Sequence, residues 1–147
     1  MVARRELFGA QVRERLLRKE FDSTSVEDAI HRLRLTGAVD DRRAAGAYAR
    51  HSTEIKSRGR RRILRELGKL GVNTSDAQQA VDDAYTGISE ATLLSQVLRR
   101  RLTGLIETEA QFRQLYSTLL RQGFESCAIV ALLKTKTAAT IRPDEES

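Results

Sequence analysis

The hydrophobic positions of this chain recur at helical spacings on either side of a turn, and this arrangement occurs three times. The copies are anchored on Phe21, Val72 and Phe124, which lie 51 and 52 residues apart. Apolar residues stand nine and five positions before each anchor, and five, eight and nine positions after it. They are Val12, Leu16, Val26, Ala29 and Ile30; Ile63, Leu67, Ala77, Ala80 and Val81; and Leu115, Leu119, Ile129, Leu132 and Leu133. The pattern predicts three pairs of helices, each joined by a short turn.

Residues suited to end one helix and to begin the next flank the three anchors. Gly71 and Gly123 directly precede two of them, where a helix commonly ends in a left-handed residue. Polar residues that favour helix starts follow each anchor, namely Ser23, Thr24 and Ser25; Asn73, Thr74 and Ser75; and Glu125 and Ser126. We expect these residues to cap the second helix of each pair, each cap contributing about 1 kcal/mol.

The pattern as a whole predicts an all-α protein, because alternating strand-like segments are scarce and the chain has one proline. The expected helices cover residues 4–20, 25–35, 59–70, 75–85, 89–102, 108–122 and 126–136, with one more starting after Asp40. Phe8, Ala44, Tyr48 and Ile55 are expected to face inward. We expect tandem repeats of three-helix units that form an elongated, curved array. The predicted units are residues 1–57, 58–104 and a truncated third at 105–137, followed by a flexible tail at 138–147 that frays from Thr137.

Composition and charge narrow the class of partner. The chain has 147 residues, of which 40% are hydrophobic and 31% charged, so we expect a folded protein rather than a disordered one. The formal net charge is +6, and the sequence pI is about 10.0. Such an excess of cations, mostly arginine, favours an acidic or phosphate-bearing partner.

Cysteine usage and hydropathy bear on the compartment. Cys127 is the single cysteine, which excludes an intramolecular disulfide and is typical of a reducing cytosol. The longest apolar run, residues 127–133, is too short to cross a bilayer, and the first residues lack the apolar core of an export signal. No heptad pattern is long enough for a coiled coil. We therefore expect a monomeric, cytoplasmic protein.

The residue types that carry out catalysis are present but scattered. His31 and His51 fall on different expected helices, where solvated side chains are the ordinary outcome, and Cys127 is expected to be a small buried hydrophobic residue. The pair Asp40-Asp41 follows a glycine-containing turn and is expected to cap a helix, whereas Asp82-Asp83 is expected to lie on a solvated face. The sequence has neither zinc-ligand spacing nor a glycine-rich phosphate loop. We expect no enzymatic activity, no metal and no cofactor.

A basic helical face is the most informative candidate site. Six of the ten residues from 56 to 65 are basic, and several of them fall within about 100° on a helical wheel. The candidate partner-binding residues are Arg50, Lys56, Arg58, Arg61, Arg62, Arg65, Lys69, Arg99, Arg100 and Arg101. The face carries no aromatic side chain, which argues against base stacking on single strands. An acidic protein surface or a duplex backbone suits it better.

Several short motifs, taken in order, resemble the RecX family over about residues 5–135. They are Gly37-x-x-Asp40-Asp41 with Ala45, Tyr48 and Arg50; Gly59 with Arg61-Arg62-Ile63, Glu66-Leu67 and Gly71-Val72; and Leu119-Leu120-Arg121-Gln122-Gly123-Phe124 with Ile129. The sequence departs from the family pattern at Ala44, Ser52 and Leu70, where phenylalanine, arginine and lysine are usual. These departures concern the partner contact more than the fold.

The resemblance implies a small all-helical regulator of the RecA recombinase. Members of the family bind along the groove of the RecA filament and mainly inhibit filament growth, ATP hydrolysis, strand exchange and co-protease activity. These processes belong to recombinational DNA repair and the SOS response. Some members also bind DNA, so single- or double-stranded DNA is a second expected partner. The hydrophobic periodicity alone implies a helical array and no particular partner.

Two other classes of function remain open from the residues themselves. A DNA-binding regulator is one, because three-helix units resemble helix-turn-helix domains whose basic helices enter the major groove. The basic face, however, lacks the Asn, Gln and Ser side chains that read base edges. The other is a non-catalytic helical scaffold whose charge serves only solubility.

Overall fold

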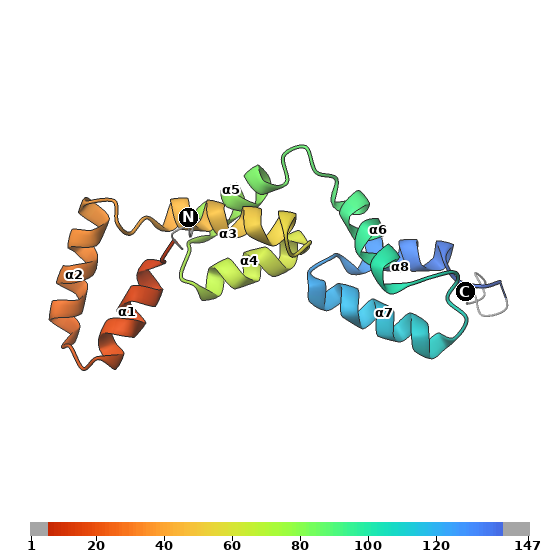
Figure 1. Cartoon of the computed structure of the whole chain (residues 1–147), viewed down its shortest axis with the longest axis horizontal. Helices are drawn as coiled ribbons and strands as arrows, with labels where there is room; N and C mark the ends of the chain where they lie inside the picture. Colours follow the sequence, from red (N-terminus) through yellow and green to blue (C-terminus); the bar gives the residue numbers. More distant parts are fainter. Residues whose placement is uncertain (1–5, 140–147) are drawn as a thin grey trace. The chain divides into compact units, whose positions relative to one another are not determined.

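The computed structural model describes residues 6–139, and in that range the backbone forms eight α-helices and no strand (Figure 1). Their bounds are α1 Gly9–Arg18, α2 Ser23–Leu35, α3 Asp41–Glu54, α4 Arg60–Lys69, α5 Thr74–Ala84, α6 Glu90–Arg101, α7 Glu109–Gln122 and α8 Ser126–Thr135. The prediction of an all-α fold is confirmed. Within the same range, none of these helices is both long enough and apolar enough to span a lipid bilayer.

The threefold pattern of the sequence is visible in the backbone. In each helical pair the N–H group of the anchor donates to the carbonyl five positions earlier, at 3.4 Å for Phe21, 3.0 Å for Val72 and 3.3 Å for Phe124. The residue before each anchor has a positive φ, 65° at Glu20, 84° at Gly71 and 108° at Gly123. This is the hydrogen-bond pattern of a helix that ends in a left-handed residue. The three copies therefore share one turn geometry, although only two of them use glycine.

Helix starts use caps close to the predicted positions. Asp22 accepts from the N–H of Ser25 and opens α2, one residue before the predicted cap segment, while Asn73 accepts from the N–H of Asp76 and opens α5. Asp40 accepts from the N–H of Arg43, as expected of a helix cap. The expectation for its neighbour Asp41 was wrong in part. Its carboxylate accepts a hydrogen bond from the N–H of Gly9, so it caps the start of α1 rather than the start of α3.

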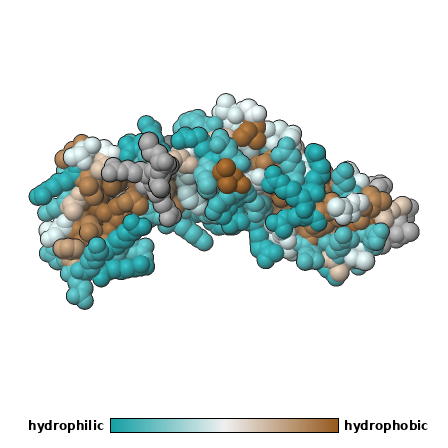
Figure 2. All heavy atoms as spheres, in the orientation of Figure 1, coloured by the Kyte–Doolittle hydropathy of each residue, from teal (hydrophilic) through white to brown (hydrophobic). Residues whose placement is uncertain are grey.

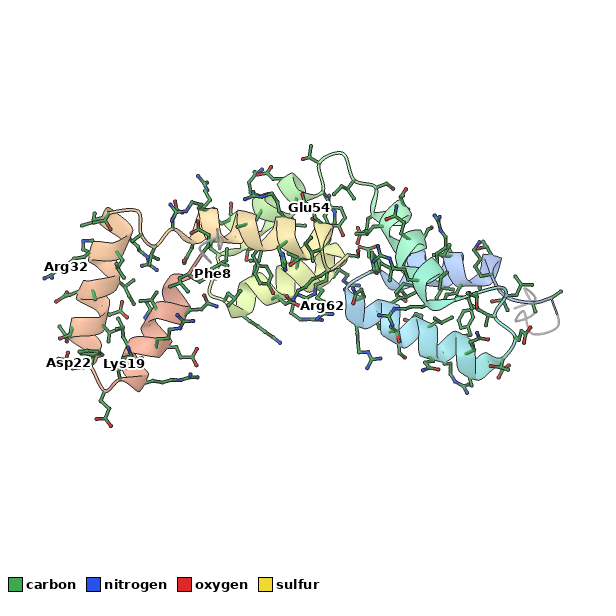
Figure 3. The ribbon with its side chains drawn as sticks, viewed as in Figure 1. Phe8, Lys19, Asp22, Arg32, Glu54 and Arg62 are labelled. Atoms are coloured by element: carbon green, nitrogen blue, oxygen red, sulfur yellow. The ribbon has the colours of Figure 1, made fainter. Side chains whose placement is uncertain are left out.

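The predicted first helix was too long. It was expected over residues 4–20, part of which lies outside the described residues, but α1 begins at Gly9. Phe8, expected on the helix face, is instead the buried N-cap residue (Figure 3), and its ring meets Tyr48 edge-on at 6.2 Å between centroids. Ile55, expected to face inward, is 68% exposed because α3 ends one residue before it. The remaining helices begin and end within two residues of their predicted bounds.

Two further expectations about burial were wrong. Cys127 is exposed rather than buried. The three anchors also differ from one another, since Phe21 is 54% exposed and the other two are buried. Thr137, expected to start a frayed tail, is buried, and its hydroxyl donates to the carbonyl of Leu133. Next to it, Ile106 exchanges backbone hydrogen bonds with Lys136 and Ala138 and forms an isolated β-bridge with Thr137. The predicted tail beyond residue 139 lies outside the described residues.

Contacts divide the described chain into two compact units. Unit 1 comprises residues 6–51 and 64–84, and unit 2 comprises residues 52–63 and 85–139. Helices α3 and α4 therefore each contribute residues to both units. Buried residues of unit 1 include Val26, Ile30, Ala45, Leu67 and Val81, and those of unit 2 include Ile63, Leu98, Leu119, Phe124, Ile129 and Leu133. The repeat boundaries at 57/58 and 104/105, and the elongated, curved arrangement, stay predictions.

Candidate partner-binding surface

The positive charge of the chain is concentrated in unit 2. Its described residues include 12 Lys or Arg and 5 Asp or Glu, an excess of seven cations. Those of unit 1 include 11 Lys or Arg and 12 Asp or Glu, which leaves one excess anion. Long-range attraction of an acidic partner therefore acts on unit 2 far more than on unit 1.

Within unit 2, the start of α4 is fixed by the end of α7. The N–H of Gly59 donates to the carbonyl of Gln122 at 3.0 Å, and the N–H of Arg61 donates to the carbonyl of Gly123 at 3.2 Å. Backbone N–H groups at the start of α4, which have no partner within that helix, thus donate to backbone carbonyls at the end of α7, which have no partner within theirs. The approach requires glycine at both positions. A Cβ at Gly59 would lie 2.3 Å from the carbonyl oxygen of Gly123, and one at Gly123 would lie 2.8 Å from that of Gly59.

A second contact in unit 2 holds Arg60 at the same helix start. Its guanidinium lies 4.8 Å from the centre of the Tyr85 ring, and its Nε lies 3.8 Å from a carboxylate oxygen of Glu90. The Tyr85 hydroxyl donates to the carbonyl of Arg58 at 2.6 Å. Burial raises the pKa of Tyr85, and the nearby Glu90 carboxylate raises it further, so the phenol stays protonated. Arg60 is thus fixed by contacts within the protein.

The predicted partner-binding cations differ in how exposed they are, and their role in binding stays a prediction. Arg58 and Arg62 are half-buried. Arg62, labelled in Figure 3, places Nη1 3.4 Å from Oε1 of Gln122 and 3.5 Å from the carbonyl of Arg121. Its guanidinium is used inside unit 2 because the close approach of the glycines brings the α7 end within reach. Arg100 is exposed, but its Nη1 reaches the hydroxyl of Ser57 at 3.4 Å.

The other predicted cations are exposed on several elements. They are Arg50, Lys56, Arg61, Arg65, Lys69, Arg99 and Arg101. Arg61, Arg65 and Lys69 follow one another at steps of four residues along α4, so they share one face of that helix. Of the exposed set, Arg50, Arg65 and Lys69 belong to unit 1, where acidic residues balance them, and the others belong to unit 2.

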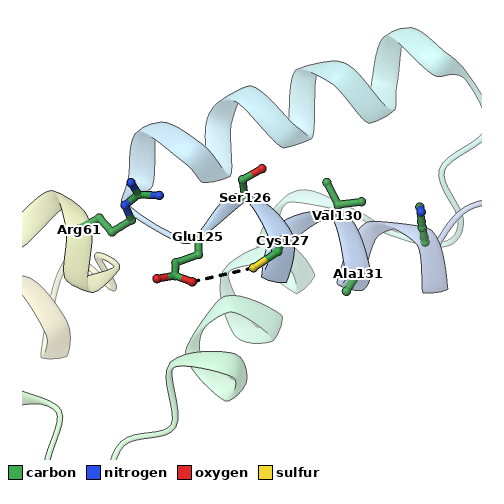
Figure 4. Close-up of a pocket in the computed structure, with 7 residues that line it drawn as sticks. Arg61, Glu125, Ser126, Cys127, Val130 and Ala131 are labelled. Atoms are coloured by element: carbon green, nitrogen blue, oxygen red, sulfur yellow. Dashed lines mark hydrogen bonds between the residues drawn. The ribbon is translucent and has the colours of Figure 1, made fainter.

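Unit 2 also carries an open groove of about 830 Å³ beside α8, which the sequence did not indicate (Figure 4). It is lined by Arg61, Glu125, Ser126, Cys127, Val130, Ala131 and Lys134. Arg61 and Lys134 supply positive charge, Glu125 supplies one carboxylate, and Val130 and Ala131 supply apolar surface. An acidic segment with one apolar side chain would match this lining.

The contribution of α8 to this groove was not predicted from the sequence. The segment from 127 to 133 is apolar without interruption, and Cys127 at its start was expected to be buried. A helix packed on one side buries only a stripe of its surface, so a helix that is apolar all round must expose some of it. Here Ile129 and Leu133 are buried, whereas Cys127 and Ala131 are exposed. The uninterrupted apolar segment was therefore the feature of the sequence that could have indicated an exposed apolar surface on this helix.

The remaining candidate residues lie where the sequence placed them. His31 and His51 are exposed, and so are Asp82 and Asp83, as expected of solvated side chains. Among the described residues, no three or more His, Cys, Asp or Glu side chains come together in a way that could hold a metal ion. The fold and these residues place the chain among small all-α proteins built from three-helix units.

Comparison with known proteins identifies the family. Residues 40–81, which contain α3, α4 and most of α5, match the model of the second three-helix domain of RecX. The chain is 30% identical over 135 residues to the regulatory protein RecX of Syntrophotalea carbinolica, covering 88% of this chain and 86% of the relative. It is 32% identical over 127 residues to the regulatory protein RecX of Treponema pallidum, covering 83% and 77%. The chain belongs to the RecX family of regulatory proteins.

Solved structures support the same fold. A crystal structure of regulatory protein RecX superimposes with a TM-score of 0.66 at 20% identity, over 88% of this chain and 64% of that chain. The crystal structure of RecX from Lactobacillus salivarius gives a TM-score of 0.64 at 18% identity, over 88% and 85%. The predicted fold class and the predicted family are therefore both confirmed. The regulatory names of the relatives agree with the expectation of a role other than catalysis.

Proposed function

We propose that this chain binds the filament of the RecA recombinase and restrains it, without chemistry of its own. Membership of the RecX family supports this assignment, since the relatives are named regulatory proteins. The expected effects are slower filament growth, ATP hydrolysis, strand exchange and co-protease action, in the cytoplasm during recombinational repair and the SOS response. The binding itself would obstruct the filament.

The observation that carries the proposal is the excess of cations in unit 2, two of which, Arg61 and Lys134, line an open groove. An acidic segment of the filament would lie along the groove, with one carboxylate facing Arg61 near the start of α8 and another facing Lys134 near its end, both exposed, while an apolar side chain rests on Val130 and Ala131. Exposed ion pairs contribute only about 0.2–1 kcal/mol each, so specificity needs the apolar contact as well. The seven excess cations of unit 2 would mainly accelerate encounter with the acidic partner.

The test is the ATPase activity of RecA on single-stranded DNA, measured while this protein is added. Wild-type protein should inhibit at substoichiometric amounts. The variant Arg61→Glu with Lys134→Glu should require at least tenfold more protein, which corresponds to about 1.4 kcal/mol of lost binding. Inhibition that persists unchanged in this variant would remove the groove from the proposal.

A matched control separates the groove from net charge. Arg15→Glu with Lys19→Glu makes the same change of charge on exposed residues of unit 1 and should inhibit like wild type. Equal loss in both variants would mean that overall charge, rather than the groove, determines binding. Far-UV circular dichroism should show the same helical content in all three proteins.

A DNA-binding regulator is the second candidate, favoured by the exposed row Arg61, Arg65 and Lys69 on α4. Recognition helices usually present their N-terminal residues to the bases, but the start of α4 is held by carbonyls of Gln122 and Gly123. Three phosphate contacts, one from each residue of this row, would give a log–log salt slope of about −3. Tight, sequence-specific duplex binding at two salt concentrations, with an unaffected ATPase, would favour this candidate. If neither the ATPase nor duplex DNA responds to the protein, the remaining candidate is a non-catalytic helical scaffold.

A further inference from the structure

Unit 2 contains a cavity of about 460 Å³, the α6–α8 cavity, which is lined by α6, the segment after α6 and the end of α8. Leu98, Leu102 and Leu132 supply its apolar surface, and Arg99 and Lys136 supply two exposed cations. Figure 2 shows hydrophobic surface, in brown, next to hydrophilic surface, in teal, over this part of unit 2. A ligand that matches this lining combines an apolar side chain with negative charge.

The two cations of the α6–α8 cavity are not balanced by its own lining. No described residue forms an ion pair with Arg99 or Lys136. None of the described residues that line the cavity is acidic. The groove beside α8 differs in this respect, because Glu125 lines it together with Arg61 and Lys134. A ligand of the α6–α8 cavity therefore has to supply the negatively charged groups.

The path of the backbone brings the end of the described chain to this cavity. The N–H of Ile106 donates to the carbonyl of Lys136 at 2.7 Å, and the N–H of Ala138 donates to the carbonyl of Ile106 at 2.9 Å. Ile106 is buried, and it closely follows Leu102 and Gly104, which line the cavity. These hydrogen bonds hold residues 136–138 beside the cavity, so the rest of the chain starts from its edge.

The last residues of the sequence carry the groups that the cavity lacks. Residues 144–146 are Asp-Glu-Glu, the single run of three acidic residues in the sequence, and Ile141 precedes them. Arg142 offsets one of the three charges. Asp144 follows Lys136 by eight residues, which an extended chain spans in at most about 28 Å. This length suffices to return to a cavity that Lys136 itself lines.

We propose that residues 140–147 bind the α6–α8 cavity of their own chain, with the carboxylates of residues 144–146 against Arg99 and Lys136 and with Ile141 on the leucines. Exposed ion pairs are individually weak. The segment is attached at the edge of the cavity, however, so its effective concentration there is in the millimolar range. The bound segment competes with any acidic or phosphate-bearing partner for these two cations. This inference goes beyond the RecA proposal and does not depend on it, because it uses neither RecA nor the groove beside α8.

The first test is crosslinking of the whole chain by a water-soluble carbodiimide, which joins a lysine amine to a nearby carboxylate as an amide. Arg99→Lys places an amine at the cavity, and Arg101→Lys places one in the same last turn of α6. Arg101 is exposed like Arg99, but it lines a different cavity, together with Gln114 of α7. Peptide mass spectrometry should find at least tenfold more linkage to residues 144–146 from position 99 than from position 101, because the bound carboxylates lie beside position 99 alone.

A second test leaves both arginines in place and removes the charges of the segment. The variant is Asp144→Asn with Glu145→Gln and Glu146→Gln. Loss of the bound segment should shift the methyl NMR signals of the leucines that line the cavity, namely Leu98, Leu102 and Leu132. The matched control makes the same change of charge on exposed residues of unit 1, by Asp28→Asn with Asp82→Asn and Asp83→Asn, and should leave these signals unchanged.

Four results would each overturn the proposal. The first is equal linkage from positions 99 and 101. The second is linkage between two chains, seen as a product of twice the 16.5 kDa mass of one chain, because a second copy would then supply the carboxylates. The other two are unchanged leucine signals in the segment variant and equal shifts in the unit 1 control.

Discussion

Units 1 and 2 are built from the same kind of helical pair but use their charged residues differently. In unit 1 cations are matched by carboxylates, as in Arg13 with Glu27 at 2.6 Å and Arg43 with Glu6 at 3.1 Å. In unit 2 cations outnumber carboxylates by seven. Surface ion pairs contribute little stability. The main consequence of the nearly equal numbers of cations and carboxylates in unit 1 is therefore that this unit exerts little long-range attraction on a charged partner. A repeated helical template can therefore hold a neutral unit and a basic unit in one chain.

The two units also differ in how they use glycine in their backbone turns and contacts. In unit 2, Gly59 and Gly123 bring two main-chain segments into hydrogen-bonding contact. In unit 1, the turn between α1 and α2 contains Glu20, a non-glycine residue in the left-handed conformation. The first arrangement depends on the absence of a side chain, and the second tolerates one at a cost in strain. Substitutions at these positions can test the difference.

The largest expected effect is that of Gly59→Ala in unit 2. The new methyl group would lie 2.3 Å from the carbonyl oxygen of Gly123 and 2.7 Å from the amide nitrogen of Phe124, so two backbone segments must separate. We expect a loss of about 3 kcal/mol in the free energy of unfolding, measured by urea denaturation.

Gly68→Ala is the matched control for that substitution. Gly68 lies within α4, in unit 1, and a Cβ there would meet nothing within 4 Å. Alanine should stabilise the helix by about 0.5–1 kcal/mol. If Gly59→Ala were no more damaging than Gly68→Ala, the close approach in unit 2 would have no energetic importance.

A smaller gain is expected from Glu20→Gly in unit 1. Glu20 has a φ of 65° at the position that Gly71 and Gly123 occupy in the other two pairs. Glycine removes the left-handed strain of about 1–2 kcal/mol but increases the entropy of the unfolded chain, so we expect a net stabilisation of about 1 kcal/mol. Thermal unfolding would show it as a higher midpoint. Glu20→Gln, which removes the charge and keeps the strain, should show no such gain.

The smallest expected effect is a loss of helicity at low pH. The side-chain hydrogen bond with Ser25 lowers the pKa of Asp22, the cap of α2. The folded pKa lies below the unfolded one, so the cap stabilises α2 fully above the unfolded pKa and is lost as the pH falls through the folded pKa. In an Asp22→Asn variant the side-chain amide can still cap the helix but does not titrate. As the pH is lowered below about 4, the helicity of wild type should therefore fall slightly more than that of the variant, by circular dichroism.

The helices could be predicted from the sequence because apolar spacing and turn residues are local signals. Gly71 and Gly123 indicated where two helices end, and the three anchors indicated where each helical pair turns. Burial could not be predicted in the same way. Phe21 matches Phe124 in its local pattern, but Phe124 is buried and lines a cavity together with Leu94 of α6. Whether a covering helix is present does not follow from the pattern of the pair itself.

The candidate site was predictable to a lesser degree. Helical periodicity placed Arg61 on an exposed face, but it placed Arg62 there as well, and Arg62 contacts Gln122, 60 residues away. Lys134 was not singled out, because only the folded chain brings it to the groove with Arg61. Local patterns identified which cations exist, and long-range contacts determined which of them remain available to a partner.

The path of the chain has a practical consequence. Among the described residues, unit 1 comprises 6–51 and 64–84, while unit 2 comprises 52–63 and 85–139. A polypeptide that ends anywhere from 52 to 83, or that begins anywhere from 53 to 84, would therefore contain fragments of both units and the whole of neither. Deletion mapping would report misfolding as loss of function, so the contributions of the two units have to be separated by single-residue changes in the intact chain.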